Sequence, residues 1–413
     1  MSSPKYSVIV FGATSFVGQI LCHYLVDQFG SKLKWAAAGR SQAKLEALRA
    51  DLGPSAAKLP LLIADADDEA SLLAMCAHTQ VLVSTVGPYA LYGEPLIRVC
   101  VETGTDYCDL TGEVQWIRRM ITRYEAQAKT SGARIVHCCG FDSLPSDLGV
   151  HFLQQQARAR FGQPCTSVKM RVKAMAGTAS GGTVASLINV IKEAVKDPAL
   201  RRELADPYSI CPSDHGYRTR QPNVTRGQFD ADFNSWITPF VMAAINTRIV
   251  HRSNALSGNA YGANFKYGEA VMTHTGPKGW MMAQGMAVGI AGFMAAVAVP
   301  PLRRVIEKYV VPKPGEGPSP AAQARGFYDF RFIGTTEAGQ TLRVKVTGDR
   351  DPGYGSTAKM LGQAAACLAQ DIPHEERAGG FWTPATIFGD KLIKRLVADA
   401  GLTFTVLEAP DQA

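Results

Sequence analysis

A short glycine-containing segment between an apolar run and an amphipathic stretch constrains this chain more than any other feature. Residues 6–11 (Tyr-Ser-Val-Ile-Val-Phe) predict a buried strand, residues 12–18 (Gly-Ala-Thr-Ser-Phe-Val-Gly) predict a tight turn, and a helical pattern follows. Gly12 allows a sharp turn off the strand, and Gly18 allows the helix to pack close to the sheet. This order is typical of sites that hold the phosphates of a dinucleotide on free backbone N–H groups. A strand-to-helix turn without a ligand is the alternative.

The middle of this segment departs from the usual pattern. Ser15 stands where such turns usually carry their second glycine. Serine keeps the side chain small, and its hydroxyl can face a phosphate. We therefore expect the phosphates to lie against Gly12, Thr14, Ser15, Phe16 and Gly18.

The end of the second predicted strand indicates which dinucleotide binds. Residues 34–44 contain no acidic residue, whereas a site that prefers NAD places Asp or Glu there to bind the ribose 2′-hydroxyl. Arg40, supported by Ser41 and Lys44, offers a guanidinium and additional positive charge to a 2′-phosphate. We therefore predict an NADP(H) site that includes Gly39, Arg40 and Lys44. An ordinary solvated arginine is the alternative, although a helix start disfavours a cation that no anion compensates.

The next strand ends supply further candidate contacts. Asp65 follows the third predicted strand, and a carboxylate there can reach an adenine amino group. Residues 81–86 form a continuous apolar run, as expected of a strand covered on both faces, and Gly87, Pro88 and Tyr89 follow. Because ligands bind at the carboxyl ends of parallel strands, we expect these three residues to pass beside the nicotinamide ribose and ring.

Motifs spread along nearly the whole chain carry a family resemblance. They lie at residues 12–18, 39–40, 87–93, 104–113, 140–149, 180–183, 261–262, 348–355 and 380–385. Together they resemble the saccharopine dehydrogenase-like oxidoreductases, most strongly the branch with the mycobacterial trans-acting enoyl reductases and the animal saccharopine dehydrogenase-like oxidoreductase. The resemblance implies a Rossmann domain followed by an α+β domain. For the enoyl reductase branch it also implies NADPH-dependent reduction of a carbon–carbon double bond in a lipid.

Length and periodicity predict the same organisation. A chain of 413 residues exceeds the range over which one core usually grows. We predict an α/β fold with a Rossmann-type doubly wound parallel sheet in residues 1–148. Residues 149–350 are predicted to form an α+β domain with an antiparallel sheet, and residues 351–413 a helical segment that packs back on the Rossmann domain.

Particular segments support the second and third parts of this division. Residues 168–174, 328–333 and 341–346 alternate apolar with charged or polar residues, which is typical of strands with one wet face. The last two of these segments predict a hairpin. Residues 356–369 predict a strong helix, and the Pro/Gly-rich residues 311–320 are the best linker candidate.

Composition narrows the class of protein. The formal net charge is +7 with 46% apolar residues, and the positive charge is diffuse, which does not indicate nucleic-acid binding. An anionic cofactor or a membrane surface is enough to explain the charge. The nine cysteines include no Cys-x-x-Cys pair, which argues against a zinc site and against a disulfide scaffold and favours buried thiols in a reducing compartment. No signal peptide precedes the first strand, so we expect a cytoplasmic protein.

One segment is unusual for a soluble enzyme. Residues 279–302 carry no charge and are long enough to span a bilayer as a helix. A buried or dimer-forming helix, an element on a membrane surface and a true span are the alternatives, although Gln284 and the prolines at 300–301 weaken the last. Trp280 at one end and the arginines at 303–304 at the other match interfacial anchors. We expect the protein to form a homo-oligomer. A peripheral position on a membrane surface is a further possibility.

The proton donor is the least constrained part of the site. Tyr92, Asp142 and Ser143 lie on loops at the predicted cofactor edge, and we name them as candidate catalytic residues. Asp142 and Ser143 could equally form a helix N-cap. Asp109 could merely hold a turn with Thr111, and His137 on an apolar strand is typical of a core histidine. The polar turn at 348–355 could close over the substrate pocket or could equally be a structural turn.

Three functions remain open at this stage. The first is reduction of an enoyl group on a lipid or polyketide-type substrate, which a carrier protein could deliver. The second is oxidation or reduction at a C–N bond of an amino-acid-derived substrate, for which Arg171, Lys173, Arg218 and Arg220 are the obvious carboxylate partners. The third is a non-catalytic, membrane-associated scaffold that binds NADP.

Overall fold

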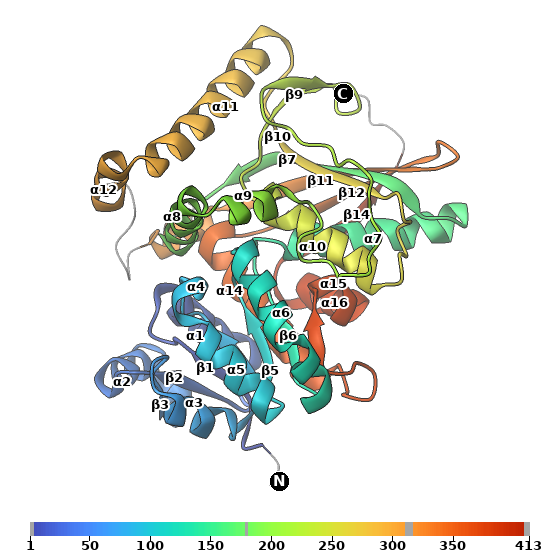
Figure 1. Ribbon diagram of the computed structural model, residues 1–413. Helices are drawn as coiled ribbons and strands as arrows, with labels where there is room; N and C mark the ends of the chain where they lie inside the picture. Colours follow the sequence, from blue (N-terminus) through green and yellow to red (C-terminus); the bar gives the residue numbers. More distant parts are fainter. Residues whose placement is uncertain (1–3, 178–180, 310–316, 409–413) are drawn as a thin grey trace.

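The computed structural model describes residues 4–177, 181–309 and 317–408 and contains two seven-stranded sheets. The first sheet lies in the lower half of Figure 1 and the second in the upper half, with helices between them. The interface between the two sheets is therefore where segments from distant parts of the chain meet.

The first sheet is parallel throughout and has the order β13-β6-β5-β4-β1-β2-β3. Its strands are β1 Tyr6–Phe11, β2 Trp35–Gly39, β3 Leu61–Ile63, β4 Thr79–Ser84, β5 Asp106–Asp109, β6 Arg134–Val136 and β13 Gly380–Trp382. The order confirms the predicted doubly wound Rossmann sheet. The strand order reverses between β1 and β4, which is where such sheets bind their ligand.

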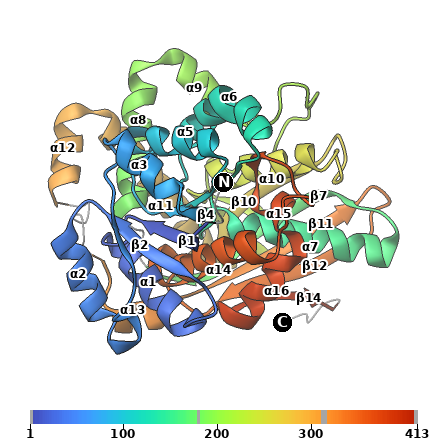
Figure 2. The ribbon, with the colours of Figure 1, turned by 90° about the horizontal axis from the view of Figure 1, so that it is seen from below.

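Helices cover both faces of this sheet. They are α1 Phe16–Phe29, α2 Gln42–Asp51, α3 Glu69–Cys76, α4 Tyr89–Tyr92, α5 Glu94–Thr103, α6 Val114–Ser131 and α14 Thr357–Gln370, with the short 3₁₀ turn η1 Pro54–Ala56. In β1, Val8 and Val10 face the core shared with α1 and α14, whereas Ile9 and Phe11 face α3, α5 and α6. Figure 2 shows these two sets of helices on opposite faces of the sheet. This alternation explains why β1 is apolar along its length.

The second sheet is mixed and has the order β14-β12-β11-β7-β10-β9-β8, in which only β7 and β10 pair in parallel. Its strands are β7 Cys165–Ala176, β8 Gln228–Asp230, β9 Ser235–Thr238, β10 Lys266–Met272, β11 Phe327–Thr336, β12 Thr341–Gly348 and β14 Leu402–Leu407. Strands β11 and β12 confirm the predicted hairpin. In β12 the buried Leu342, Val344 and Val346 alternate with more exposed residues, so one face of the hairpin is wet.

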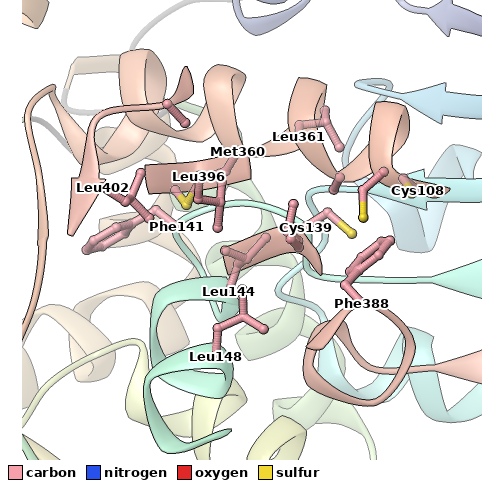
Figure 3. Packing of buried hydrophobic residues seen from close by; sticks show 14 of the residues in the cluster. Cys108, Cys139, Phe141, Leu144, Leu148, Met360, Leu361, Phe388, Leu396 and Leu402 are labelled. Atoms are coloured by element: carbon pink, nitrogen blue, oxygen red, sulfur yellow. The ribbon is translucent and has the colours of Figure 1, made fainter. Parts of the chain in front are cut away.

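The two sheets share one continuous core, which is built by the helices between them. These are α7 Leu144–Phe161, α10 Ala243–Leu256, α15 Pro384–Ile387 and α16 Gly389–Asp399, together with α14. Figure 3 shows Leu144 and Leu148 of α7 beside Met360 of α14 and Leu396 of α16. Burial of apolar surface, at roughly 25 cal/mol per Å², is the main force that holds the sheets together.

The C-terminal segment contributes to both sheets. Helix α14 confirms the helix predicted at residues 356–369 and packs on α1 and on strands of the first sheet. Strand β13 extends the first sheet, and β14 lies at the edge of the second. The predicted boundaries near residues 148 and 350 stay predictions.

All nine cysteines are free thiols and eight of them are buried, as predicted.

Two sequence motifs fall partly outside the described residues. Most of the predicted linker at 311–320 lies there, and Pro320 begins the short helix α13 Pro320–Ala324. Residue 180 of the motif at 180–183 also lies there, and α8 Gly181–Lys196 begins with the next residue. Helix α9 Pro198–Ala205 follows α8.

The charge-free segment forms a helix at the margin of the molecule (Figure 1). Helix α11 Gly276–Ala298 contacts α8, β8, β9 and the next helix, α12 Pro300–Tyr309. It is long and apolar enough to cross a membrane, with a mean hydropathy of 1.6 over its most apolar window, but only 17% of that window is buried. The alternative of a buried core helix is therefore wrong, and most of α11 has no partner among the described residues.

Candidate cofactor site and active site

Two glycines make the turn after β1 possible. Gly12 has a positive φ of +83°, and a Cβ there would lie 2.7 Å from Thr85 Oγ1 and 2.8 Å from Val86 Cγ2. A Cβ at Gly18 would lie 2.2 Å from the carbonyl oxygen of Gly12. Both positions therefore require glycine, one for its backbone conformation and its space, the other for the close approach of α1.

The start of α1 presents unused hydrogen-bond donors. Within the described residues, the backbone N–H groups of Thr14, Phe16 and Val17 have no hydrogen-bond acceptor. They lie in the turn and the first turn of the helix, where the helix dipole is positive. Free N–H groups at this end of a helix are suited to a pyrophosphate, so the turn fits the phosphates of a dinucleotide. We call residues 12–18 the phosphate turn.

Ser15 has a structural role at this turn. Its Oγ accepts a hydrogen bond from Gly18 N at 2.9 Å, which caps α1, and it lies 2.9 Å from Thr85 Oγ1. Thr85 Oγ1 in turn donates to the carbonyl oxygen of Gly12 at 2.9 Å. The Ser15 hydroxyl thus links the turn to the end of β4.

The basic residues at the end of β2 are available to an anion. Arg40 is exposed, and within the described residues it makes no ion pair and no hydrogen bond. Ser41 caps α2 by accepting from Lys44 N at 3.4 Å, and the Lys44 side chain is exposed. A Cβ at Gly39 would lie 3.7 Å from Thr14 Oγ1, so the Arg40 loop adjoins the phosphate turn. This placement fits the 2′-phosphate of NADP(H).

Asp65 lies after β3, as the sequence predicts. One oxygen of its carboxylate, Oδ1, accepts a hydrogen bond from Asp67 N at 3.2 Å, which holds the turn before α3. The other oxygen makes no hydrogen bond within the described residues. The expected contact to adenine stays a prediction.

Charge reversal at Arg40 tests the cofactor preference. We expect Arg40→Glu to weaken NADPH binding about tenfold to 100-fold, because a carboxylate would repel the 2′-phosphate and the guanidinium bond would be lost. NADH binding should be unchanged or tighter. Fluorescence titration with both cofactors measures the effect.

Lys58→Glu is the matched control, because it makes the same charge change at an exposed position. Lys58 precedes β3 and so lies at the end of that strand that faces away from the candidate cofactor site. Equal affinities of the unaltered protein for NADPH and NADH would contradict the assignment of Arg40.

The segment after β4 is held by buried hydrogen bonds. Tyr89 is buried. Its hydroxyl donates to Ser84 O at 2.9 Å and accepts from Leu110 N at 3.2 Å. The Glu113 carboxylate accepts from Tyr89 N at 2.7 Å and from Ala90 N at 3.2 Å. These bonds fix the backbone at Gly87 and Pro88 across the ends of β4 and β5. Tyr92, at the end of α4, is 43% exposed.

Asp109 and His137 join the ends of β5 and β6. Asp109 Oδ1 accepts from Thr111 N at 3.1 Å and from Cys138 N at 3.2 Å, and Oδ2 lies 2.7 Å from His137 Nδ1. The His137 ring is buried against the rings of Trp116 and Phe381. The predicted turn between Asp109 and Thr111 is confirmed, and His137 is a core residue. Its Nε2 has no hydrogen-bond partner within the described residues.

Asp142 and Ser143 lie where β6 leads into α7. Ser143 occupies the N-cap position of α7, in line with the alternative that this pair begins a helix, but its hydroxyl donates to Asn246 Oδ1 at 2.9 Å and makes no capping bond. The Asp142 carboxyl is half-buried, and no described residue donates a hydrogen bond to it. Burial, with a smaller contribution from Asp109, raises the pKa of Asp142 to about 7.

A buried polar network supports Ser143 from the second sheet. Asn246 Nδ2 donates to Glu269 Oε2 at 2.9 Å, and the Tyr267 hydroxyl donates to Glu269 Oε1 at 2.7 Å. Burial raises the pKa of Glu269 to about 7. Asn246, Glu269 and Glu113 are functional-site residues that the sequence did not predict. Only Glu113 had a signal, as the last residue of the motif at 104–113.

The motif at 348–355 lies beside the phosphate turn. The Tyr354 ring packs edge-on against the Phe16 ring, with 4.8 Å between centroids, and the Tyr354 hydroxyl accepts from Gly181 N at 3.0 Å. A Cβ at Gly317 would also contact the Phe16 ring. Residues 181, 317 and 354, which are far apart in the sequence, thus lie together near the first turn of α1.

The middle domain does not offer Arg171 to a substrate carboxylate. Its Nη2 lies 2.7 Å from Asp230 Oδ2, its Nε donates to the same oxygen at 2.8 Å, and its Nη1 donates to the carbonyl oxygens of Met170 and Gly268. The guanidinium is therefore saturated in a buried ion pair.

Comparison with known proteins identifies the family. Residues 8–136 match the model of the saccharopine dehydrogenase NADP-binding domain. A trans-acting enoyl reductase of Mycobacterium bovis is 38% identical over 411 residues, which cover 95% of this chain and 96% of that protein. A Mycobacterium tuberculosis protein whose name assigns the same activity provisionally is 42% identical over 404 residues, with the same coverage.

A solved structure supports the fold. The saccharopine dehydrogenase (L-Glu forming) of Saccharomyces cerevisiae superposes with a TM-score of 0.57 at 11% identity, over 97% of this chain and 100% of that one. Sequence likeness, the parallel sheet and the phosphate turn therefore agree. The chain belongs to the saccharopine dehydrogenase-like oxidoreductases, in the branch of the trans-acting enoyl reductases, and carries their NADP-binding domain.

Proposed function

We propose that the protein uses NADPH to reduce the carbon–carbon double bond of an enoyl group on a lipid or polyketide-type substrate. The names of relatives that match 95% of this chain support the reaction. The observation that carries the proposal is the Asp142 carboxyl, which lies at the carboxyl edge of the parallel sheet and receives no hydrogen bond from any described residue. Its pKa of about 7 suits a group that must give up a proton near neutral pH.

The chain's own residues divide the work between binding and proton transfer. The free N–H groups of Thr14, Phe16 and Val17 and the Arg40 guanidinium would hold the cofactor's phosphates. When bound, NADPH supplies a hydride to one carbon of the double bond. Asp142 would donate a proton to the neighbouring carbon, and because it is half-buried it would regain that proton from solvent.

The other two candidates have different roles in this proposal. The Ser143 hydroxyl already donates to Asn246, so its proton is not free, and it would position the loop that carries Asp142. Tyr92 is exposed on α4 and would contact substrate beside the nicotinamide edge.

A pocket beside the segment after β4 suits an apolar acyl chain. Its lining includes the apolar side chains of Pro88, Leu91, Ala185 and Ile188, together with Asn189 and the ion pair of Lys192 with Glu307 of α12. A mainly apolar lining with a few polar groups is typical of sites that bind small apolar molecules. A carrier protein would present the thioester end of such a substrate.

We also propose a cytoplasmic protein that works at the surface of a membrane, where lipid substrates are found. Self-association into a homo-oligomer is the competing use of its exposed apolar surface. The exposure of α11 supports either use, contact with a membrane surface or self-association.

The reaction class can be tested with purified protein and NADPH. We expect NADPH to be consumed with trans-2-enoyl thioesters of coenzyme A or of a carrier protein. It should not be consumed when saccharopine's components, an amino acid and a keto or aldehyde partner, are supplied instead. Consumption only with the second set would establish C–N chemistry. Tight NADPH binding without turnover of either set would indicate a scaffold.

A further inference from the structure

Exposed apolar side chains are concentrated on one part of the surface. Half of the large apolar side chains that are exposed in the described residues lie between Trp280 and Tyr309, although this segment is less than a tenth of the chain. We call this surface the α11–α12 face. Its most exposed members include Met281 (59%) and Val288 (71%) on α11 and Val305 (54%) on α12. Helix α12 has no buried residue at all.

The attachment of α11 leaves this face without a partner among residues 4–177, 181–309 and 317–408. A stripe of small residues, Gly279, Ala283 and Ala287, is buried against the second sheet, and Thr238 Oγ1 donates to Ala283 O at 2.9 Å. Near its other end, Phe293 and Val297 pack on α8. On the opposite side of the helix, a Cβ added at position 285, 289 or 292 would meet no atom of a described residue within 4 Å. Only one narrow side of α11 is therefore used by the fold.

Positively charged residues lie at both ends of the charge-free stretch. No charged residue occurs from 279 to 302, Lys278 precedes this stretch, and Arg303, Arg304 and Lys308 follow it. Glu307 is the only acidic residue of α12, and it is paired with Lys192 of α8. Both ends of the α11–α12 face are thus positive.

The topology excludes a single crossing of a bilayer. Strand β10 precedes α11 and β11 follows α12, and both strands pair with β7 in the same sheet. A helix that crossed the bilayer would separate them. Any membrane contact of α11 must therefore lie in the plane of the surface.

We propose that the α11–α12 face docks, in the plane of the membrane, on a lipid bilayer that carries anionic head groups. Its apolar side chains would enter the boundary between head groups and acyl chains, and its cations would meet the anionic head groups. A second copy of the chain fits less well. Because both ends of the face are positive, parallel and antiparallel self-pairing alike bring cations together.

Docking would also bring the substrate pocket to the lipid, a step that rests on the proposed lipid substrate. The pocket with Pro88 and Ile188 in its walls lies between α4, α8 and α12. Ser186 of α8 donates to Glu113 Oε1 at 2.9 Å, and Glu113 holds the backbone after β4. Helix α8 thus connects the α11–α12 face to the predicted nicotinamide edge, so an acyl chain could pass from the bilayer to the site without crossing water.

Vesicle flotation without substrate tests the docking. The unaltered protein should float with vesicles of phosphatidylcholine and phosphatidylglycerol and much less with phosphatidylcholine alone. We expect Met281→Lys/Val288→Lys, a pair seven positions apart on the exposed side, to lower vesicle partition about 100-fold. Phe293 is unsuitable for this test because it packs on α8.

A control and a second variant keep the experiment decisive. Leu73→Lys/Val397→Lys makes the same kind of change at exposed positions of α3 and α16 and should leave flotation unchanged. Arg303→Glu/Arg304→Glu changes only charges and should abolish the preference for anionic vesicles. NADPH affinity and thermal melting should be unchanged in every variant.

Three results would overturn the proposal: no flotation of the unaltered protein, equal flotation with both vesicle types, or flotation that survives both α11–α12 variants. A lipid-free dimer that the Met281→Lys/Val288→Lys variant dissolves, without vesicle binding, would assign the face to a second copy. Since no enoyl substrate is present, the result does not depend on the proposed reaction. Failure of that reaction would show only in the turnover assay.

Discussion

Valine in place of Gly12 is expected to weaken NADPH binding about 100-fold or more. Gly12 has a φ of +83°, which a β-branched residue strongly disfavours, and its Cβ would press on Thr85 and Val86. Relief of these contacts would displace the turn whose N–H groups face the phosphates. Because both neighbours belong to the protein itself, some loss of thermal stability should accompany the loss of affinity. Fluorescence titration and thermal melting, run on the same sample, separate the two effects.

Gly30→Val is the matched control. Gly30 ends α1, also has a positive φ of +51°, and nothing lies within 4 Å of a Cβ added there. It should lose stability through its backbone conformation but keep its affinity for NADPH. The turn would not be the phosphate site if Gly12→Val kept its NADPH affinity, or if the affinity fell only at temperatures at which the variant was already unfolded.

The first sheet could be predicted because its signals are local. Tyr6–Phe11 and the glycine turn lie next to each other in sequence, so the strand, the turn and the helix could be identified together. The ends of β2 and β4 could be placed beside this turn because parallel strands carry their ligand sites at one edge. The same rule brought Asp142 to the site, since it follows β6.

The partners of these residues could not be predicted, because they come from distant segments. Asn246 and Glu269, which support Ser143, lie about a hundred residues further along the chain. Strands β13 and β14 are short and join different sheets, and nothing in their own residues indicates which. Ser15 could not be recognised as a helix cap bound to Thr85, because its hydroxyl suits a phosphate equally well.

The position of α11 shows a different limit. A charge-free helix of this length has the same composition whether it lies in a core, against another subunit or on a lipid surface. Only its surroundings distinguish these cases, and in the described structure the Met281 and Val288 side chains are mostly exposed. The flanking cations, which the sequence did show, become informative once this exposure is known.

Asp142→Asn should lower kcat for enoyl reduction about 10²-fold to 10⁴-fold, the usual contribution of a positioned general acid. Asparagine keeps the shape of the side chain but has no proton to give, so NADPH affinity should be unchanged. In the unaltered protein only the protonated carboxyl is active. Because the pKa of Asp142 is raised to about 7, kcat should be maximal below that pH and fall as the pH rises through it. The variant should lose this dependence.

Asp147→Asn separates this role from the general effect of removing a buried carboxyl near the start of α7. Burial raises the pKa of Asp147 to about 7 as well, but its oxygens accept hydrogen bonds from Ser253 Oγ at 2.6 Å and from Ala385 N at 2.8 Å. It therefore ties α7 to α10 and α15, and its replacement should lower thermal stability while the pH profile of kcat stays in place. If both variants lost activity equally and kept the same pH profile, Asp142 would have only a structural role. Asp142→Glu should restore part of the rate together with a shifted profile, because it returns a proton to the site at a slightly different position.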